Sequence, residues 1–128
     1  MKRYLSRILL VALVAGGVAA CRMAPVMNVE DTQFLSEAPS MEAAEQTIKL
    51  AGAGLGWQMK TIAPGHIVAS LPLRSHLAVT DIMFDRDSYS IRYKDSSNLK
   101  YDGNQIHSNY NGWVQHLQAA ISSRSATF

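Results

Sequence analysis

The histidines are the side chains best suited to acid–base chemistry or metal binding near neutral pH. The chain has four of them, His66, His76, His107 and His116. The expected elements place the first two at opposite ends of one hairpin and the last two on opposite sides of one helix. The chain has no His-Glu-x-x-His motif and a single cysteine. Because no candidate ligands converge, we expect no metal site and no cofactor.

Other catalytic patterns are equally scarce. No serine lies in a Gly-x-Ser-x-Gly elbow. Asp85 and Asp87 form the closest carboxylate pair, and a tight polar hairpin turn explains both. A calcium loop starting at Asp85 would need glycine and glutamate where Ser90 and Ser96 stand. The glycine-rich residues 52–56 follow an expected helix, whereas a nucleotide loop precedes one. We therefore predict a non-enzymatic protein.

A polar stretch between residues 93 and 113 is the remaining candidate for a binding site. Its side chains would form an aromatic-rimmed patch that recognises a glycan, a peptide or a partner loop. The patch residues are Asp95, Asn98, Tyr101, His107, Asn109 and Asn111. The competing interpretation is architectural: Asp95 and Asn98 bond the backbone of a long connection, and Asn109 or Ser108 caps the last helix. Both interpretations are open from the sequence alone.

The chain begins with the layout of a secretory signal. Three basic residues within the first ten precede an apolar run over residues 8–15 and a small-residue stretch over 16–20. The segment from Ile8 to Ala20 has 13 residues, whereas a membrane-spanning helix needs about 20. We therefore expect residues 1–20 to be a cleaved signal peptide.

The end of this segment, Val18-Ala19-Ala20-Cys21, resembles a bacterial lipobox. The resemblance implies that Cys21 becomes the new N-terminus and carries diacylglycerol and palmitate, the only covalent group expected on the chain. Two or more acyl chains give lasting membrane attachment. Arg22 stands where aspartate would favour retention in the inner membrane, so we expect the outer membrane, with the domain facing the periplasm. The alternative is an ordinary signal with an incidental Cys21.

Composition indicates one small globular domain. Of 128 residues, 48% are hydrophobic and 17% are charged. The net charge of +2 comes from the export segment, since removing its three basic residues leaves nine basic residues against ten acidic ones. A nucleic-acid partner is therefore not expected. If lipid occupies the one cysteine, no disulfide can form, and a packed core must stabilise the domain.

Residues 21–39 are predicted to be the lipidated cysteine and a flexible tether, and residues 40–124 a single periplasmic domain. Neither helical nor strand periodicity persists in residues 22–39, and a proline stands near each end. Such a tether would reach on the order of 25 Å. The alternative is that residues 26–34 pack as an edge segment.

The domain is predicted to be α+β, with the order α-β-β-β-β-α. Ser40 is a plausible N-cap for a helix over residues 41–53. A four-stranded antiparallel meander follows, with strands over residues 57–62, 67–71, 76–84 and 89–93. A last helix carries the apolar positions Ile106, Tyr110, Trp113, Val114, Leu117 and Ile121. Both helices are expected to cover one sheet face, where Gly112 would allow close approach.

The strand register also follows from the pattern. Apolar residues share one face if the third and fourth strands pair Phe84 with Tyr89, Ile82 with Ile91 and Thr80 with Tyr93. The same register sets Asp81 opposite Arg92 on the other face. A four-residue loop over residues 72–75 would then pair Leu71 with His76, Ala69 with Ala78 and Ile67 with Thr80.

Several motifs together resemble a family of small proteobacterial lipoproteins of uncharacterised activity. Besides the lipobox, they include Tyr89-Ser90-Ile91-x-Tyr93-x-Asp95-Ser96 and Ile106-His107-x-Asn109-Tyr110-Asn111-x-Trp113. The likeness covers roughly residues 56–121. It implies an exported lipoprotein with a compact α/β domain, and it supplies no catalytic residue.

We therefore expect a non-enzymatic interaction or accessory module in the cell envelope, held at the membrane by its lipid and binding another envelope protein. Its contact surface would be the sheet face that no helix covers. The expected residues of that face are Gln58, Lys60, Val68, Val79, Asp81, Met83, Ser90, Arg92 and Lys94. The alternative is a lipoprotein that binds a small ligand or glycan through the polar patch.

Overall fold

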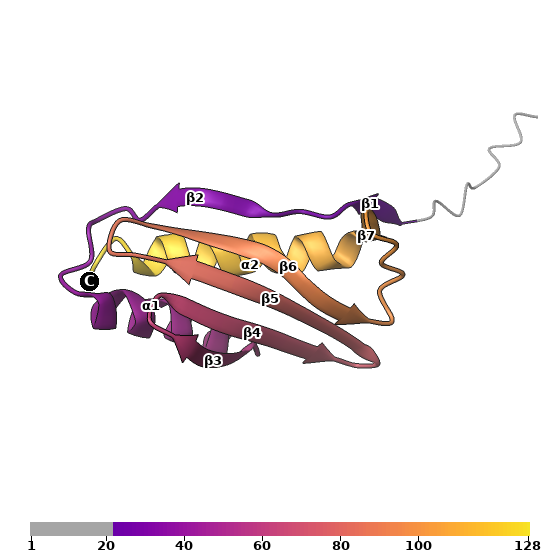
Figure 1. Ribbon diagram of the computed structural model, residues 1–128, viewed down its shortest axis with the longest axis horizontal. Coiled ribbons are helices and arrows are strands. Elements are labelled where there is room, and N and C mark those ends of the chain that lie inside the picture. Colours follow the sequence, from indigo (N-terminus) through magenta and orange to yellow (C-terminus); the bar gives the residue numbers. More distant parts are fainter. Residues whose placement is uncertain (1–21) are drawn as a thin grey trace, which may run out of the picture.

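The computed structural model describes residues 22–128. The predicted signal peptide and the lipidation site at Cys21 lie outside the described residues. Within them, the fold is α+β: two helices accompany a five-stranded antiparallel sheet and a separate two-stranded sheet. Figure 1 looks onto the larger sheet, with α2 passing behind it.

The elements follow in the order β1 (Met23–Pro25), β2 (Val29–Gln33), α1 (Met41–Gly54), β3 (Gln58–Ala63), β4 (His66–Leu73), β5 (His76–Phe84), β6 (Ser88–Ser97), β7 (Gln105–His107) and α2 (Ser108–Arg124). The larger sheet has the strand order β2-β6-β5-β4-β3. The smaller one joins β1 to β7.

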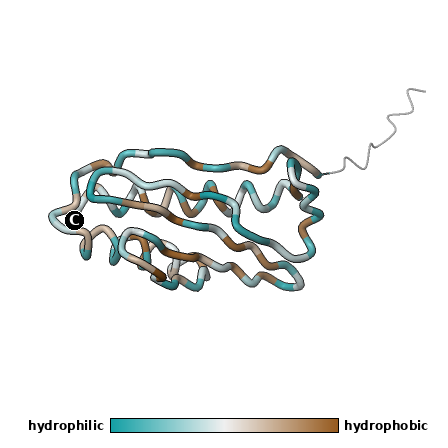
Figure 2. The backbone as a smooth tube through the Cα atoms, in the orientation of Figure 1, coloured by the Kyte–Doolittle hydropathy of each residue, from teal (hydrophilic) through white to brown (hydrophobic). Residues whose placement is uncertain are grey.

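One face of the larger sheet forms the core. Side chains alternate between the two faces of a strand, and Figure 2 shows hydrophobic and hydrophilic residues alternating along the strands. The buried row at the centre runs from Ile67 through Ile82 to Ile91 and Val29 on four neighbouring strands.

Both helices cover this same face, as predicted. In α1, Gly52 lies against Met59 of β3 and Glu45 bonds Thr61 of that strand. In α2, the backbone oxygen of Gln118 accepts a hydrogen bond from the hydroxyl of Tyr89 on β6. The helices bury mainly aliphatic and small residues against the sheet: Ala44, Ile48 and Ala51 from α1, and Tyr110, Val114, Leu117 and Ile121 from α2.

The predicted helix ends are partly right. The Ser40 side chain accepts a hydrogen bond from Ala43 N–H, which confirms the N-cap of α1. In α2 the cap is His107, whose ring accepts from Asn109 N–H, so neither Ser108 nor Asn109 is the N-cap. Ile106 belongs to β7. A Cβ atom at Gly112 would meet no heavy atom within 4 Å, so this glycine does not serve close approach to the sheet.

The four-stranded meander is correct for β3 to β6 and incomplete, because β2 adds a fifth strand at the β6 edge. Val29 pairs with Ile91, and a bulge shifts the register before Thr32 pairs with Tyr89. The bulge explains the missing strand periodicity, since it breaks the alternation of side chains.

The expectation of a flexible tether is therefore wrong for residues 22–39, and the edge-segment alternative is closer. β1 pairs with β7. Beyond β2, the side chains of Phe34 and Ala38 are buried, and Leu35 N–H donates to Ser125 Oγ at 2.9 Å. Since both strands of this segment pair with a strand of the domain, residues 22–39 belong to the folded unit.

The β5–β6 register is confirmed at Phe84–Tyr89, Ile82–Ile91, Thr80–Tyr93 and Asp81–Arg92. The β4–β5 register is wrong by two residues, because Leu73 pairs with His76 across a two-residue turn. Pro72 consequently lies in β4, beyond the end of the β3 pairing at Ser70. At Pro72 the β5 side of β4 has a neighbouring strand and the β3 side has none among the described residues. A missing N–H on the open side leaves no carbonyl group of a neighbouring strand without its hydrogen bond.

Candidate interaction surface

The predicted polar patch is built mostly of side chains that bond the protein's own backbone. Asn98 has a positive φ of 57°. Its Nδ2 donates to Ser75 Oγ at 2.9 Å, and its carbonyl oxygen lies 2.7 Å from Nδ1 of His76. Asn98 therefore fixes the β6–β7 connection to the β4–β5 turn.

Asn111 performs the same role for the N-terminal segment. Its Oδ1 accepts from Met27 N–H and its Nδ2 donates to Pro25 C=O, each at 2.9 Å. An amide that bonds one donor and one acceptor of the same segment is satisfied on both sides. Together with the His107 cap, these contacts support the architectural interpretation for three patch residues.

The other three patch residues are exposed. Asp95 accepts from Ser96 N–H at 2.8 Å. The ring of Tyr101 stacks on Tyr93 with centroids 4.0 Å apart. Asn109 makes no side-chain hydrogen bond within residues 22–128. The chain thus brings the patch together at one end of the molecule, and leaves Asn109 and parts of Asp95 and Tyr101 free to meet a ligand.

Beneath this patch lies a fully buried tyrosine. Tyr110 packs edge-on against Tyr93 with centroids 5.6 Å apart, and its hydroxyl finds no hydrogen-bond partner among the described residues. Burial raises the pKa of Tyr110, as it does that of Tyr93 to a lesser extent. Both phenols therefore stay protonated at neutral pH, which suits a core role.

Within residues 22–128, no helix covers the sheet face opposite α1 and α2, and this face carries paired polar groups; we call it the outer face. The β-ladder places these residues side by side on it: Gln58, Lys60, His66, Val68, Ser70, Val79, Asp81, Met83 and Arg92. Lys94 lies at a bulge of β6, and its ion pair with Asp81 places it on the same face. This confirms the predicted alternation except at Ser90, which is buried under β2, where its Oγ accepts from Asp31 N–H.

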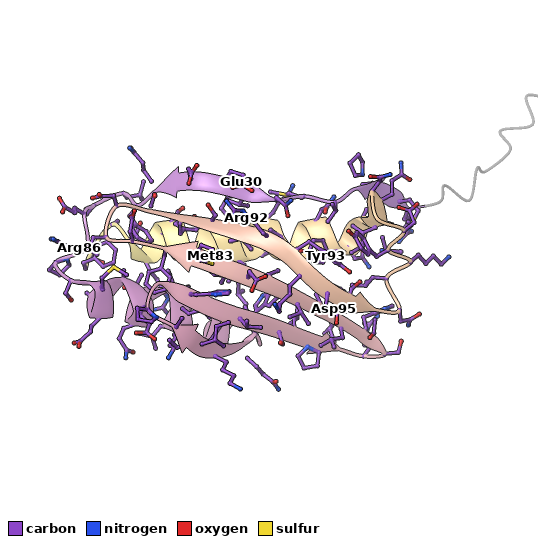
Figure 3. All side chains as sticks on the ribbon, viewed as in Figure 1. Glu30, Met83, Arg86, Arg92, Tyr93 and Asp95 are labelled. Atoms are coloured by element: carbon purple, nitrogen blue, oxygen red, sulfur yellow. The ribbon has the colours of Figure 1, made fainter. Side chains whose placement is uncertain are left out.

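Most charged side chains of the outer face form ion pairs with one another, and Lys60 is the exception among the described residues. Arg92 donates to both carboxylate oxygens of Glu30, at 2.9 and 2.7 Å, and Figure 3 shows these side chains meeting across β2 and β6. The hydrogen bonds from Arg92 lower the pKa of Glu30. Asp81 Oδ1 lies 2.6 Å from His66 Nε2 and 3.6 Å from Lys94 Nζ.

Sequence reasoning missed Glu30 and His66 as members of this face. Glu30 lies on the unpredicted β2, and His66 enters β4 opposite Met83 only in the corrected register. The opposite charges of Glu30 and Arg92 were the one available signal that β2 pairs with β6, because oppositely charged residues stabilise neighbouring strands.

A groove opens at the end of the outer face that is remote from the polar patch. Its cavity of about 330 Å³ is lined by Asp31, Arg92, Met83 and the Pro64-Gly65 turn, among others. A second cavity, of about 510 Å³, continues past Met41 toward α1, with Ile62 and Phe84 in its walls. Met41, Met83 and Ile62 are each more than a third exposed, so apolar atoms face solvent along this groove.

No cluster of three or more histidine, cysteine, aspartate or glutamate side chains lies within ligand distance of a common point in residues 22–128. The histidines serve other contacts there: His66 bonds Asp81, His76 bonds the Asn98 carbonyl and His107 caps α2. His116 is exposed on α2. In the same residues, no helix is long and apolar enough to cross a membrane.

Comparison with family models, with curated proteins and with solved structures gave no match to this chain. The resemblance to small proteobacterial lipoproteins therefore stays a prediction from the motifs.

Proposed function

We propose that this protein is an outer-membrane lipoprotein, acylated at Cys21, that works as a non-enzymatic interaction module in the cell envelope. The partner is another envelope protein, and the outer face is its binding surface. Support for the anchor comes from the lipobox and from the single cysteine. Support for the surface comes from the side chains of the outer face.

The observation that carries the choice of surface is the pairing of charges beside two half-buried apolar side chains. Val68 lies on β4 directly across from Asp81, and Val79 lies two residues before Asp81 on β5. The Glu30–Arg92 pair lies on the other side of Asp81, across the β5–β6 ladder. Because Glu30, Arg92, Asp81 and Lys94 already have charged partners within the protein, they keep those partners when water is displaced. A mixed surface of this kind suits modest protein contacts.

In-cell photocrosslinking tests this proposal. A photoreactive residue at Val79 should yield one discrete protein adduct, and one at Gln115, exposed on the solvent side of α2, should not. The variant Val79→Glu should lose co-purification of that adduct partner while Gln115→Glu keeps it. Equal adducts at both positions, or a partner retained by Val79→Glu with the fold intact, would contradict the proposal.

The alternative, a glycan- or ligand-binding lipoprotein, rests on the polar patch. That patch keeps Asn109, Tyr101 and one side of Asp95 accessible, while the side chain of Asn98 bonds Ser75 Oγ and those of His107 and Asn111 bond backbone groups. A patch in which three of the six residues are held by hydrogen bonds within the domain offers a ligand fewer groups, which favours the outer face as the functional surface.

A further inference from the structure

The first residues after Cys21 are fastened to the folded domain. Ser108 N–H, at the start of α2, donates to the carbonyl oxygen of Arg22, and Val26 N–H donates to Asn104 C=O at 3.0 Å. β1 lies between these two bonds and pairs with β7. A residue covalently bonded to Arg22 has its Cα about 3.8 Å away. Only one peptide bond therefore separates Cys21 from a residue that is hydrogen-bonded to the domain.

The surface around this attachment point combines three chain segments. Figure 1 places β1, the β4–β5 turn and the β6–β7 connection at the same end of the molecule. Hydrogen bonds join them, since Asn98 bonds Ser75 and His107 N–H donates to Leu99 C=O. The exposed side chains here that suit a lipid surface are Arg22, Leu73, Arg74, Lys100 and Tyr101, which we call the anchor-end surface.

The cations of this surface are free. Arg22, Arg74 and Lys100 form no ion pair within residues 22–128, in contrast to Arg86, Arg92 and Lys94. The nearby carboxylate of Asp102 accepts N–H bonds from Asn104 and Gln105 at 2.9 and 2.7 Å and forms no ion pair with these cations within residues 22–128. The three cations therefore have no carboxylate partner of their own there that an external anion would have to displace.

Two of these cations stand on backbone with a positive φ, a conformation that residues with a Cβ atom disfavour. Arg74, Asn98 and Lys100 have φ values of 56°, 57° and 54°, and they are three of the four non-glycine residues with positive φ in the described chain. Glycine adopts this region at no steric cost, and strained residues of this kind gather at functional sites. Tyr101 and Leu73, each 40% exposed, add the amphipathic ring and apolar side chain typical of a membrane interface.

We propose that the anchor-end surface lies directly on the headgroup layer of the anchoring membrane and binds the phosphate groups of anionic phospholipids through Arg22, Arg74 and Lys100. The proposal rests on the proposed lipid anchor. Its consequence is a fixed orientation: the outer face stands upright from the membrane, and the groove beside Met41 points away from it.

Two single-cysteine labels test the orientation, because acylation consumes the native thiol. Gln105→Cys places a fluorophore next to the anchor-end surface, and Ser123→Cys places one about 22 Å farther along α2 from Ser108. The acylated protein in vesicles of phosphatidylethanolamine and phosphatidylglycerol should show strong quenching by headgroup-labelled lipid at Gln105→Cys and little at Ser123→Cys. Equal quenching at both sites would overturn the fixed orientation.

A second arm tests the headgroup contact without the anchor. The chain from residue 21 carrying Cys21→Ser should bind these anionic vesicles better than neutral ones. Arg74→Gly with Lys100→Gly should weaken that binding about 30-fold, since each cation near an anionic surface contributes about five-fold. Glycine suits the positive φ at both positions, so the fold is kept.

The matched control removes the same charge elsewhere. Lys60→Ala with Arg124→Ala should weaken vesicle binding only a few-fold, because both residues are exposed away from the anchor end. Equal losses in the two double variants, or no preference of the unsubstituted chain for anionic vesicles, would overturn the proposal. An unacylated Cys21 in cells would refute the anchor alone, since the vesicle arm does not depend on it.

Discussion

Asn111 holds the N-terminal segment against α2 through two hydrogen bonds, so its replacement tests whether the polar patch is architectural. Each bond contributes about 0.5–1.5 kcal/mol net. Losing both in Asn111→Ala should therefore lower the unfolding free energy by about 2 kcal/mol. For a domain of this size, 1 kcal/mol corresponds to about 4–8 °C in Tm, so we expect a decrease of about 10 °C.

The assay is thermal unfolding followed by circular dichroism, on the non-acylated chain carrying Cys21→Ser. Asn109→Ala is the matched control, because this exposed neighbour makes no side-chain hydrogen bond within residues 22–128, and it should change stability by less than about 0.5 kcal/mol. Asn111→Asp should be intermediate, since it accepts from Met27 N–H and cannot donate to Pro25 C=O. An Asn111→Ala variant as stable as the control would refute the architectural reasoning.

Three further predictions concern glycines and acid stability. Gly112→Ala should raise the unfolding free energy by about 0.5–1 kcal/mol in denaturant titrations, because this helical position has open space for a Cβ. Gly65→Ala should lower it by at least about 1 kcal/mol, because φ is +74° and the new Cβ would lie 2.8 Å from the Phe84 carbonyl oxygen; unchanged stability would contradict that geometry. Backbone N–H groups of its own turn, first that of Ser88, hold the pKa of Asp85 below 3.8. A lowered pKa in the folded state stabilises the protein at pH values above the pKa of the unfolded chain, and this stabilisation is lost as pH falls through the folded-state pKa. The unfolding free energy of Asp85→Asn should therefore decrease less steeply at acid pH than that of the unsubstituted protein.

Elements held by local pattern could be predicted from the sequence. The β5–β6 hairpin agrees residue by residue from Thr80 to Tyr93, because strict alternation and a short polar turn leave one register that buries the apolar row. Ser40 was predictable as an N-cap from its type and from the helical spacing that follows it.

Elements that depend on distant partners could not be predicted. β2 buries a single residue, Val29, and carries a bulge, so nothing local distinguishes it from a loop until β6 is beside it. The two-residue slip of β4 on β5 preserves which side chains face the core, so the hydrophobic pattern could not detect it. The turn responsible has Arg74 at positive φ, where a glycine would have signalled the turn.

The polar patch shows a different limit. Sequence reasoning correctly singled out Asn98, His107 and Asn111 as unusual, and it could not determine whether their atoms bond a ligand or the backbone. The same amide chemistry serves both purposes. Which one applies is decided by segments far away in the chain, such as Pro25 to Met27 against Asn111.

The central claim is that this chain is a lipoprotein anchored through Cys21, and intact mass analysis of the mature N-terminal peptide tests it most directly. We expect a chain that starts at Cys21 and carries a diacylglycerol group on sulfur and a fatty acyl group on the amine, both absent from Cys21→Ser. A mature chain with an unmodified thiol at Cys21, or one cleaved at another position, would contradict it.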